Sequence, residues 1–222
     1  MTFVRWGGLA VLGAALLVLA CGGGGGGGMG PCTPGVATHL VKTSGDPAAW
    51  YLDNPLPTPL SVTARDANNC PVPGVVVNWA VASGGGGVNP SQSTTGTAGV
   101  ATTTDSIGST SPQKVSASFT GLQTPDTFTV SASTPPTSAA VSVSDNVFSP
   151  GSAVIQSGGT VTWTWAGRNI HNLTFTGGPA PQPADQGNQV TGTAQRTLTT
   201  VGKYSYTCTN HAGMNGTVRV VH

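Results

Sequence analysis

The sequence predicts an all-β protein made of two β-sandwich domains in series, and three observations lead to this fold class. The 222 residues contain no glutamate, and lysine and leucine are scarce beyond residue 30, so strong helix formers are largely missing. Valine and threonine, which favour strands, are abundant. Short runs of alternating apolar and polar residues, separated by turn residues, fall into two groups on either side of a proline-rich break.

Residues 1–20 are typical of a secretory signal peptide. Arg5 precedes an apolar run from Leu9 to Ala20, which is shorter than the roughly 20 apolar residues that a membrane-spanning helix needs. The run ends in Val18-Leu19-Ala20-Cys21, which resembles the lipobox of bacterial lipoproteins. That resemblance implies that Cys21 becomes the lipid-modified first residue of the mature chain. The alternative is an ordinary signal peptide followed by an unmodified cysteine.

Residues 21–33 form a glycine-rich tether in which every residue from Gly22 to Gly28 is glycine. Such a segment cannot pack into a core and is predicted to be a flexible link. Together with the lipid anchor, it predicts an exported protein attached to a membrane, either on the periplasmic side or at the cell surface.

Residues 34–133 are predicted to form the first sandwich. Several runs place apolar side chains on one face of a strand, with turn residues between them: Leu60, Val62 and Ala64; Val75, Val77, Trp79 and Val81; Val115, Ala117 and Phe119; Phe128, Val130 and Ala132. The strings Leu60–Asn68, Pro73–Trp79 and Thr97–Thr102 resemble bacterial Ig-like domains of the invasin/intimin type. This resemblance implies a spacer or adhesion module without chemistry of its own.

Cys32 and Cys70 are the cysteines nearest to this domain. An exported protein enters an oxidising compartment, so a Cys32–Cys70 disulfide is predicted, with two free thiols as the alternative. Their separation of 38 residues differs from that of a CxxC redox motif.

Residues 134–138 are predicted to be a linker, because Pro135 and Pro136 favour extended backbone. Residues 139–222 then form the second sandwich. Two of its predicted strands carry large inward-facing side chains: Val161, Trp163 and Trp165, and then Tyr204, Tyr206 and Cys208.

Four residues of the second domain carry the chemistry. Cys208, His211 and Met214 follow a strand in the string Cys-Thr-Asn-His-Ala-Gly-Met. His171 lies 37 residues upstream of the cysteine and reaches the same point if the two strands are neighbours. Two imidazoles and a thiolate, with a weak axial thioether, form the ligand set of type 1 (blue) copper sites. The alternatives are residues that only pack or form hydrogen bonds, and a zinc site, for which methionine is not a usual ligand.

Residues 139–222 resemble the cupredoxins, specifically the plastocyanin/amicyanin-like group. Four strings carry the resemblance: Asn146–Pro150, Gly158–Trp163, Ile170–Leu173 and Gly202–Val218. The resemblance implies an eight-strand Greek-key sandwich with one type 1 copper near one end.

The same resemblance implies roles for residues around the copper. Asn172 is expected to form a hydrogen bond toward Thr209 and so to hold the two ligand-bearing loops together. His211 is expected to be the ligand nearest to solvent. Many relatives have proline directly before this histidine, and Asn210 in its place predicts a looser loop.

The predicted function is one-electron transfer with redox partner proteins, and not catalysis. Four protein ligands leave no open position for a substrate at the metal. His39 and His222 are the histidines that remain, too few for the additional copper centre of an oxidase or a nitrite reductase. The alternative function is a copper carrier or storage protein, or an adhesin-like surface protein with a structural copper domain.

The composition limits the partners. Charged residues make up 7% of the chain, against a usual value of about 25%, and the formal net charge is +1. A nucleic-acid partner is therefore not expected, because nothing resembles a basic footprint. We expect a monomer that meets its redox partners without strong electrostatic steering by net charge.

Overall fold

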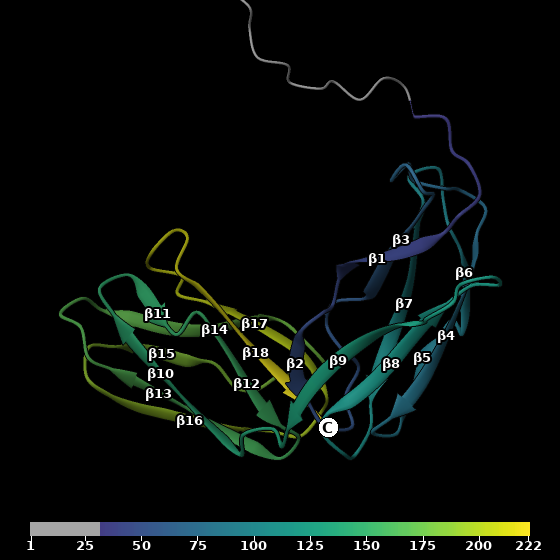
Figure 1. Cartoon of the computed structure of the whole chain (residues 1–222). Helices are drawn as coiled ribbons and strands as arrows, with labels where there is room; N and C mark the ends of the chain where they lie inside the picture. The colour runs from purple at the N-terminus through teal and green to yellow at the C-terminus, as the bar shows by residue number, and fades with distance from the viewer. Residues whose placement is uncertain (1–31) are drawn as a thin grey trace, which may run out of the picture. The chain divides into compact units, whose positions relative to one another are not determined.

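The computed structural model describes residues 32–222, and this part of the chain forms eighteen β-strands and no helix (Figure 1). The predicted all-β fold class is confirmed. The predicted signal peptide at residues 1–20, the lipidation site Cys21 and the tether up to residue 31 lie outside the described residues. Within residues 32–222, no helix has the length and hydrophobicity needed to cross a membrane.

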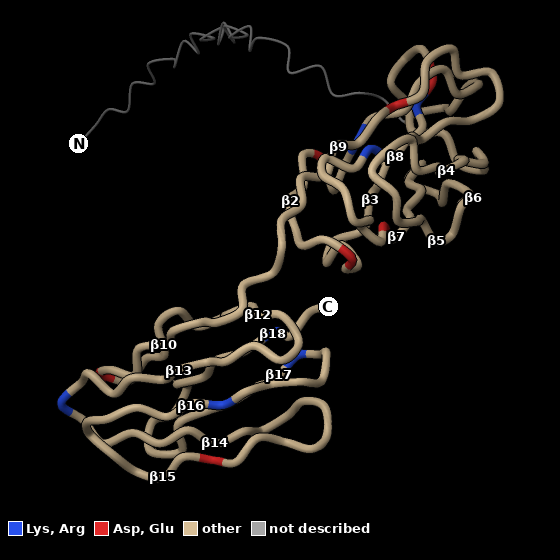
Figure 2. The backbone as a smooth tube through the Cα atoms, turned by 90° about the horizontal axis from the view of Figure 1, so that it is seen from below, with Lys and Arg blue, Asp and Glu red and all other residues tan. Residues whose placement is uncertain are grey.

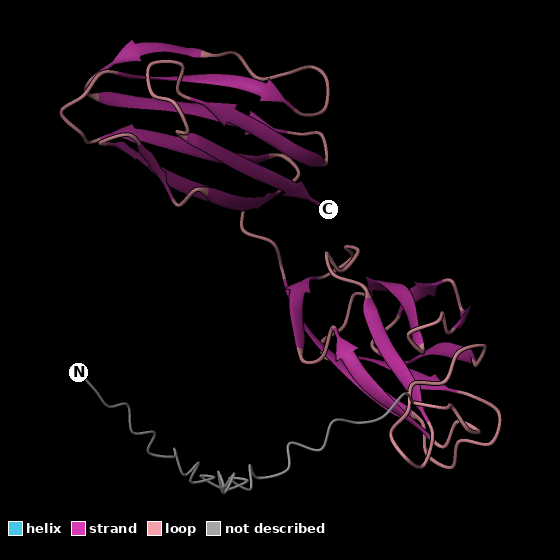
Figure 3. Cartoon of the chain, turned by 90° about the horizontal axis from the view of Figure 1, so that it is seen from above, coloured by secondary structure: helices cyan, strands magenta, loops and turns pink. Residues whose placement is uncertain are grey.

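Two separate hydrophobic cores divide the strands into an N-terminal and a C-terminal sandwich. One core joins buried side chains between Leu40 and Val130, and the other joins buried side chains between Val141 and Val220. Strands connected by loops make up both domains (Figure 3). The first set of strands ends with β9 (Asp126–Ser133) and the second begins with β10 (Ser138–Ser144). Residues 134–137 of the predicted linker therefore lie between the two sets, and its last residue, Ser138, belongs to β10.

The N-terminal domain contains a four-stranded sheet in the order β1-β3-β7-β5 and a five-stranded sheet in the order β2-β9-β8-β4-β6. Strand β2 pairs with β9 in parallel, and β1 pairs with β3 antiparallel, so the first two strands belong to different sheets. The strands before β9 are β1 (His39–Ser44), β2 (Ala48–Tyr51), β3 (Leu60–Arg65), β4 (Val76–Ser83), β5 (Gly86–Asn89), β6 (Gln92–Thr94), β7 (Val100–Ile107) and β8 (Gln113–Ser118).

The central strand β3 is buried on both faces, whereas the sequence predicts one buried face. Thr63, on the outer face, is only 4% exposed. It pairs in register with Val41 on β1 and with Val100 on β7, so a neighbouring strand flanks it on each side. A position in the middle of a sheet therefore buries a small polar residue that alternation alone would place in solvent.

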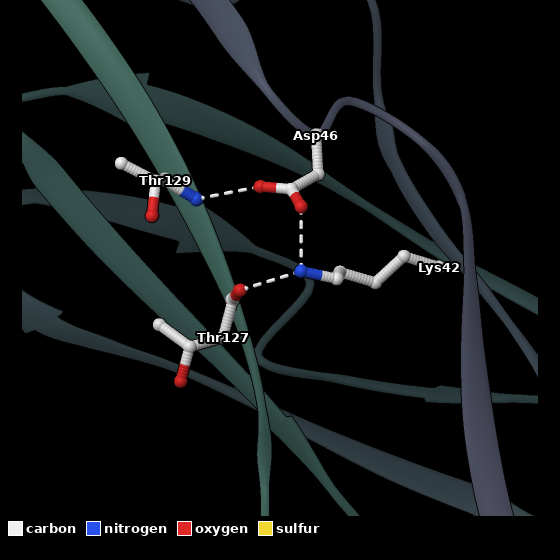
Figure 4. A network of polar contacts seen from close by, with 4 residues as sticks. All are labelled: Lys42, Asp46, Thr127 and Thr129. Atoms are coloured by element: carbon white, nitrogen blue, oxygen red, sulfur yellow. Dashed lines mark hydrogen bonds and ion pairs between the residues drawn. The ribbon is translucent and has the colours of Figure 1, made fainter.

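A polar network connects the first strand to the opposite sheet (Figure 4). Lys42 Nζ lies 2.5 Å from Asp46 Oδ2 and donates a hydrogen bond to the Thr127 carbonyl at 2.8 Å, while Asp46 Oδ1 accepts from the Thr129 amide at 2.8 Å. Burial acts to raise the pKa of Asp46, but the hydrogen bonds from Lys42 and Thr129 outweigh it and hold the pKa below its ordinary value. Charged residues are sparse (Figure 2), and this is the one ion pair within residues 32–222.

Asp105 is a carboxyl group inside the N-terminal core. It faces inward from β7, is 0% exposed, and neither of its carboxylate oxygens has a hydrogen-bond partner among the described residues. Burial raises the pKa of Asp105 from 3.8 to about 6, because the charged form loses its hydration there. The Gln113 side chain beside it acts to lower the pKa but does not outweigh burial. The alternation of β7 identifies Asp105 as inward-facing, but only the fold shows that its carboxylate lacks a hydrogen bond of ordinary geometry.

The C-terminal domain has nine strands within residues 138–221, in two sheets with the orders β11-β10-β13-β16 and β12-β18-β17-β14-β15. The strands after β10 are β11 (Val147–Ser149), β12 (Ser152–Gln156), β13 (Gly159–Trp165), β14 (His171–Gly177), β15 (Gln186–Gln189), β16 (Gly192–Leu198), β17 (Gly202–Thr207) and β18 (Asn215–Val221).

The domain has one strand more than the eight that the resemblance implies, and the chain changes sheets between β11 and β12. β11 pairs with β10, whereas β12 pairs with β18 in the other sheet. Pro150 and Gly151 lie between β11 and β12. Proline cannot donate a hydrogen bond to a strand ladder, which favours the end of one ladder and the change of sheet at this point.

The core of the C-terminal domain is built around Tyr206. Its ring centroid lies 4.8 Å from that of Phe148, 5.5 Å from that of Trp163 and 5.9 Å from that of Phe175, all with steeply inclined planes. Gly216 pairs with Tyr206 across β18 and β17. A Cβ atom at Gly216 would collide with two ring carbons and lie 2.6 Å from the tyrosine Oη, so close packing requires glycine there.

Asp105→Asn is expected to remove a pH dependence from the stability of the N-terminal domain. The pKa of Asp105 is raised in the folded protein, so between about pH 4 and 6 the folded state holds a proton that the unfolded chain has released. The domain therefore loses on the order of 1–3 kcal/mol of stability as the pH rises through this window. Calorimetric unfolding of both proteins from pH 4.5 to 7.5 measures the difference, and parallel pH profiles would refute it.

Gly216→Ala is expected to destabilise the C-terminal domain by about 1–3 kcal/mol, because the added methyl group overpacks the core against Tyr206. Gly177→Ala is the matched control, since a Cβ atom at Gly177 meets no atom within 4 Å. Thermal unfolding of the metal-free proteins measures both effects. Equal melting temperatures for the two variants would contradict the packing argument.

Candidate metal centre

His171 begins β14 and faces the core. It is 0% exposed, and its carbonyl oxygen accepts a hydrogen bond from Trp165 Nε1 at 3.1 Å. Trp165 ends β13, so this bond fixes the start of β14 against a strand of the opposite sheet. The sequence predicts Trp165 as a core residue, and the structure adds this direct contact with the backbone of a candidate ligand.

The loop after β17 closes into tight turns that present the other candidate ligands. The Cys208 amide donates to the Met214 carbonyl at 3.0 Å, the His211 amide to the Cys208 carbonyl at 3.4 Å, and the Met214 amide to the His211 carbonyl at 3.3 Å. Gly213 has a φ of 79°, a left-handed conformation that glycine adopts without strain. This loop therefore holds its three candidate ligands by local hydrogen bonds.

The structure brings His171, Cys208 and His211 together. Their ligand atoms all lie within 4.8 Å of one another. Cys208 Sγ lies 3.8 Å from His171 Nδ1 and 3.6 Å from His211 Nδ1, so both rings present the same nitrogen to the sulfur. Met214 is 2% exposed and belongs to the same core. A soft thiolate and thioether combined with two imidazoles form the donor set that suits copper.

Burial distinguishes the four candidate ligands. His171, Cys208 and Met214 are at most 2% exposed, while His211 is the one that is partly exposed. Burial, together with the neighbouring His211, lowers the pKa of His171 below its usual value. A lowered pKa keeps the imidazole neutral, which is the form that binds metals.

Asn172 connects the two ligand-bearing segments. Its backbone amide points at Cys208 Sγ at 3.5 Å. Its side chain donates to Thr209 Oγ1 at 2.6 Å and accepts from the Thr209 amide at 2.8 Å. The structure therefore places the two residues that were expected to support the ligands in a reciprocal pair of hydrogen bonds.

The absence of proline before His211 predicts a looser loop. In the structure, however, the Asn210 side chain forms hydrogen bonds that connect the loop to its neighbours. It donates to Asn188 Oδ1 at 2.8 Å and lies 3.4 Å from the Ile170 carbonyl. The sequence does not identify Asn188, because nothing in its local string distinguishes it from other asparagines in loops and edge strands.

The remaining cysteines and histidines lie apart from this cluster. Cys32 and Cys70 are both disulfide-bonded, and their pairing with each other stays a prediction; Cys208 is the free thiol among the cysteines that the structure describes. His39 contacts Thr38 and Asn69 in the N-terminal domain.

Comparison with known proteins points to the same domain. Residues 137–221 match the family described as copper binding proteins, plastocyanin/azurin family. The match begins two residues before residue 139, where the sequence predicts the start of this domain. No curated protein matches the chain.

Several solved structures are similar to part of the chain. A purple cupredoxin from Nitrosopumilus maritimus is 23% identical over 37% of this chain and 99% of its own, with a TM-score of 0.34. An amicyanin mutant in its reduced state is 27% identical over 38% of this chain and 82% of its own, with a TM-score of 0.33. An oxidised plastocyanin from Dryopteris crassirhizoma is 28% identical over 37% of this chain and 100% of its own, with a TM-score of 0.32.

The family match and the donor atoms converging from the start of β14 and from the loop after β17 complete the assignment of the C-terminal part of the chain. Residues 137–221 form a cupredoxin domain of the plastocyanin/azurin family, with a single type 1 copper site.

Proposed function

We propose that this protein is a one-electron carrier whose copper is held by His171, Cys208, His211 and Met214. The observation that carries the proposal is the approach of both histidine Nδ1 atoms to Cys208 Sγ, at 3.8 and 3.6 Å. Copper, when bound, supplies a couple between Cu(I) and Cu(II). A donor set of two imidazoles, one thiolate and one thioether accommodates both oxidation states.

The surrounding backbone contacts preorganise the candidate ligands in the metal-free chain. His171 starts a paired strand and the loop from Cys208 to Met214 is closed by its own hydrogen bonds. Ligands held in this way need little movement when the charge on the metal changes, which supports rapid electron exchange. Burial of the thiolate keeps water away from the sulfur.

The partial exposure of His211 supports a route for the electron. The other three ligands are almost fully buried. In this proposal a partner protein therefore approaches the metal from the side of His211, and the electron passes through this ligand. Four protein ligands also leave no open position for a substrate, which favours a carrier over an enzyme.

We further propose that the protein is exported and anchored by a lipid on Cys21, at the periplasmic side of a membrane or at the cell surface. In this proposal the N-terminal sandwich is an Ig-like spacer that extends the reach of the copper domain toward redox partner proteins. Its placement of β1 and β2 in different sheets is compatible with an Ig-like sandwich.

Cys208→Ser is expected to abolish the intense visible absorption band of the copper-loaded protein, because that band arises from charge transfer between the thiolate and Cu(II). The wild-type band is expected to disappear on reduction and to return on oxidation. A visible spectrum recorded during a redox titration measures both. The electron-transfer proposal would be contradicted if the protein stayed colourless and bound copper only as Cu(I), or if it bound zinc instead. Either result would favour a copper carrier.

Met214→Leu is expected to preserve the visible band and to raise the reduction potential. The thioether stabilises Cu(II), and losing an axial interaction of about 1–2 kcal/mol in that state corresponds to roughly 45–90 mV for a one-electron couple. Spectroelectrochemistry measures the shift. An unchanged potential would show that Met214 is not a ligand.

A further inference from the structure

Asn188 joins the two segments that carry the histidine ligands. It lies on β15, the edge strand that pairs with β14. Its Oδ1 accepts a hydrogen bond from Asn172 Nδ2 at 3.0 Å and another from Asn210 Nδ2 at 2.8 Å. Asn172 directly follows His171, and Asn210 directly precedes His211. One amide oxygen thus connects both segments.

We propose that Asn188 is a positioning residue of the copper site, which fixes the segment before His211 against the start of β14. This role rests on the copper ligands proposed above, but not on electron transfer as the function.

The bonds between Asn172 and Thr209 hold a different part of the loop. Thr209 directly follows Cys208, so this pair restrains the cysteine side of the loop. The segment directly before His211 is not part of this pair, and its side-chain bonds are those of Asn210 to Asn188 and to the Ile170 carbonyl.

Asn188 restrains the segment before His211. Without it, the side chain of Asn210 retains only its contact with the Ile170 carbonyl, which at 3.4 Å is longer than an ordinary hydrogen bond of about 2.9 Å. His211 is the partly exposed ligand, so its position depends on the loop more than that of buried His171 does.

The chemistry of the side chain suits this role. An amide oxygen has two lone pairs and accepts two donors at once. Leucine has a similar shape and accepts none, whereas aspartate keeps the two acceptor positions. The two substitutions therefore separate hydrogen bonding from shape.

The test compares the full chain with its Asn188→Leu and Asn188→Asp variants. Asn188→Leu is expected to release copper to a chelator about 10-fold faster, at the low end of the 10–100-fold loss typical for residues that support metal ligands. In the copper-free chain, the backbone amides of residues 209–213 are expected to exchange with deuterium about 10-fold faster, because the loop has lost a restraint. Asn188→Asp is expected to stay within about 2-fold of wild type in both measurements, because the acceptors remain.

Gln195→Leu is the matched control. Gln195 is an exposed amide whose Nε2 donates to Thr162 Oγ1 at 3.1 Å between β16 and β13, in the sheet that does not carry the ligands. It is expected to leave copper release and loop exchange unchanged.

The outcomes distinguish this role from the proposed function. Wild-type copper release and loop exchange in Asn188→Leu, beside an intact wild-type spectrum, would overturn the positioning role alone. Equal losses in Asn188→Leu and Asn188→Asp would overturn it too, because the acceptor would then be irrelevant. A wild-type chain without a type 1 spectrum would overturn the proposed ligand set and this role with it.

Discussion

The antiparallel pairing of β14 with β17 is the constraint on which the metal centre depends. His171 begins β14, Cys208 directly follows β17, and the ladder between the strands pairs Thr174 with Thr207. Side chains alternate across a strand with a period of two, so a slip of one residue would turn a ligand from the core toward solvent. The backbone hydrogen bonds of this ladder therefore set the distance between one imidazole and the thiol before any metal is involved.

The aromatic core gives this pairing its rigidity. Tyr206 lies two residues before Cys208 and contacts Phe148, Trp163 and Phe175. Close-packed protein interiors resist small displacements, so these ring contacts restrain the strand that leads into the ligand loop. The same packing surrounds the sulfur with apolar groups, and the hydrophobicity around a metal-bound thiolate is one of the factors that tune its reduction potential.

Local sequence was sufficient for much of this protein. The strands with clear alternation, such as β3, β8, β13 and β17, follow from alternation and turn residues, which act over a few neighbouring positions. The grouping of Cys208, His211 and Met214 also follows from the sequence, because one short loop holds all three. The pairing of β14 with β17, by contrast, could be inferred for His171 only through resemblance, because 37 residues separate it from Cys208.

The sequence by itself determined the all-β class, the division into two sets of strands and the grouping of Cys208, His211 and Met214, because each depends on residues close together in the chain. Only the tertiary structure decided that Thr63 and Asp105 are buried and that Gly216 must lack a side chain against Tyr206. It also decided that Asn188 bridges the two ligand segments. Each of these features depends on which strands become neighbours, and a local pattern of residue types does not encode contacts between strands that are distant in the chain.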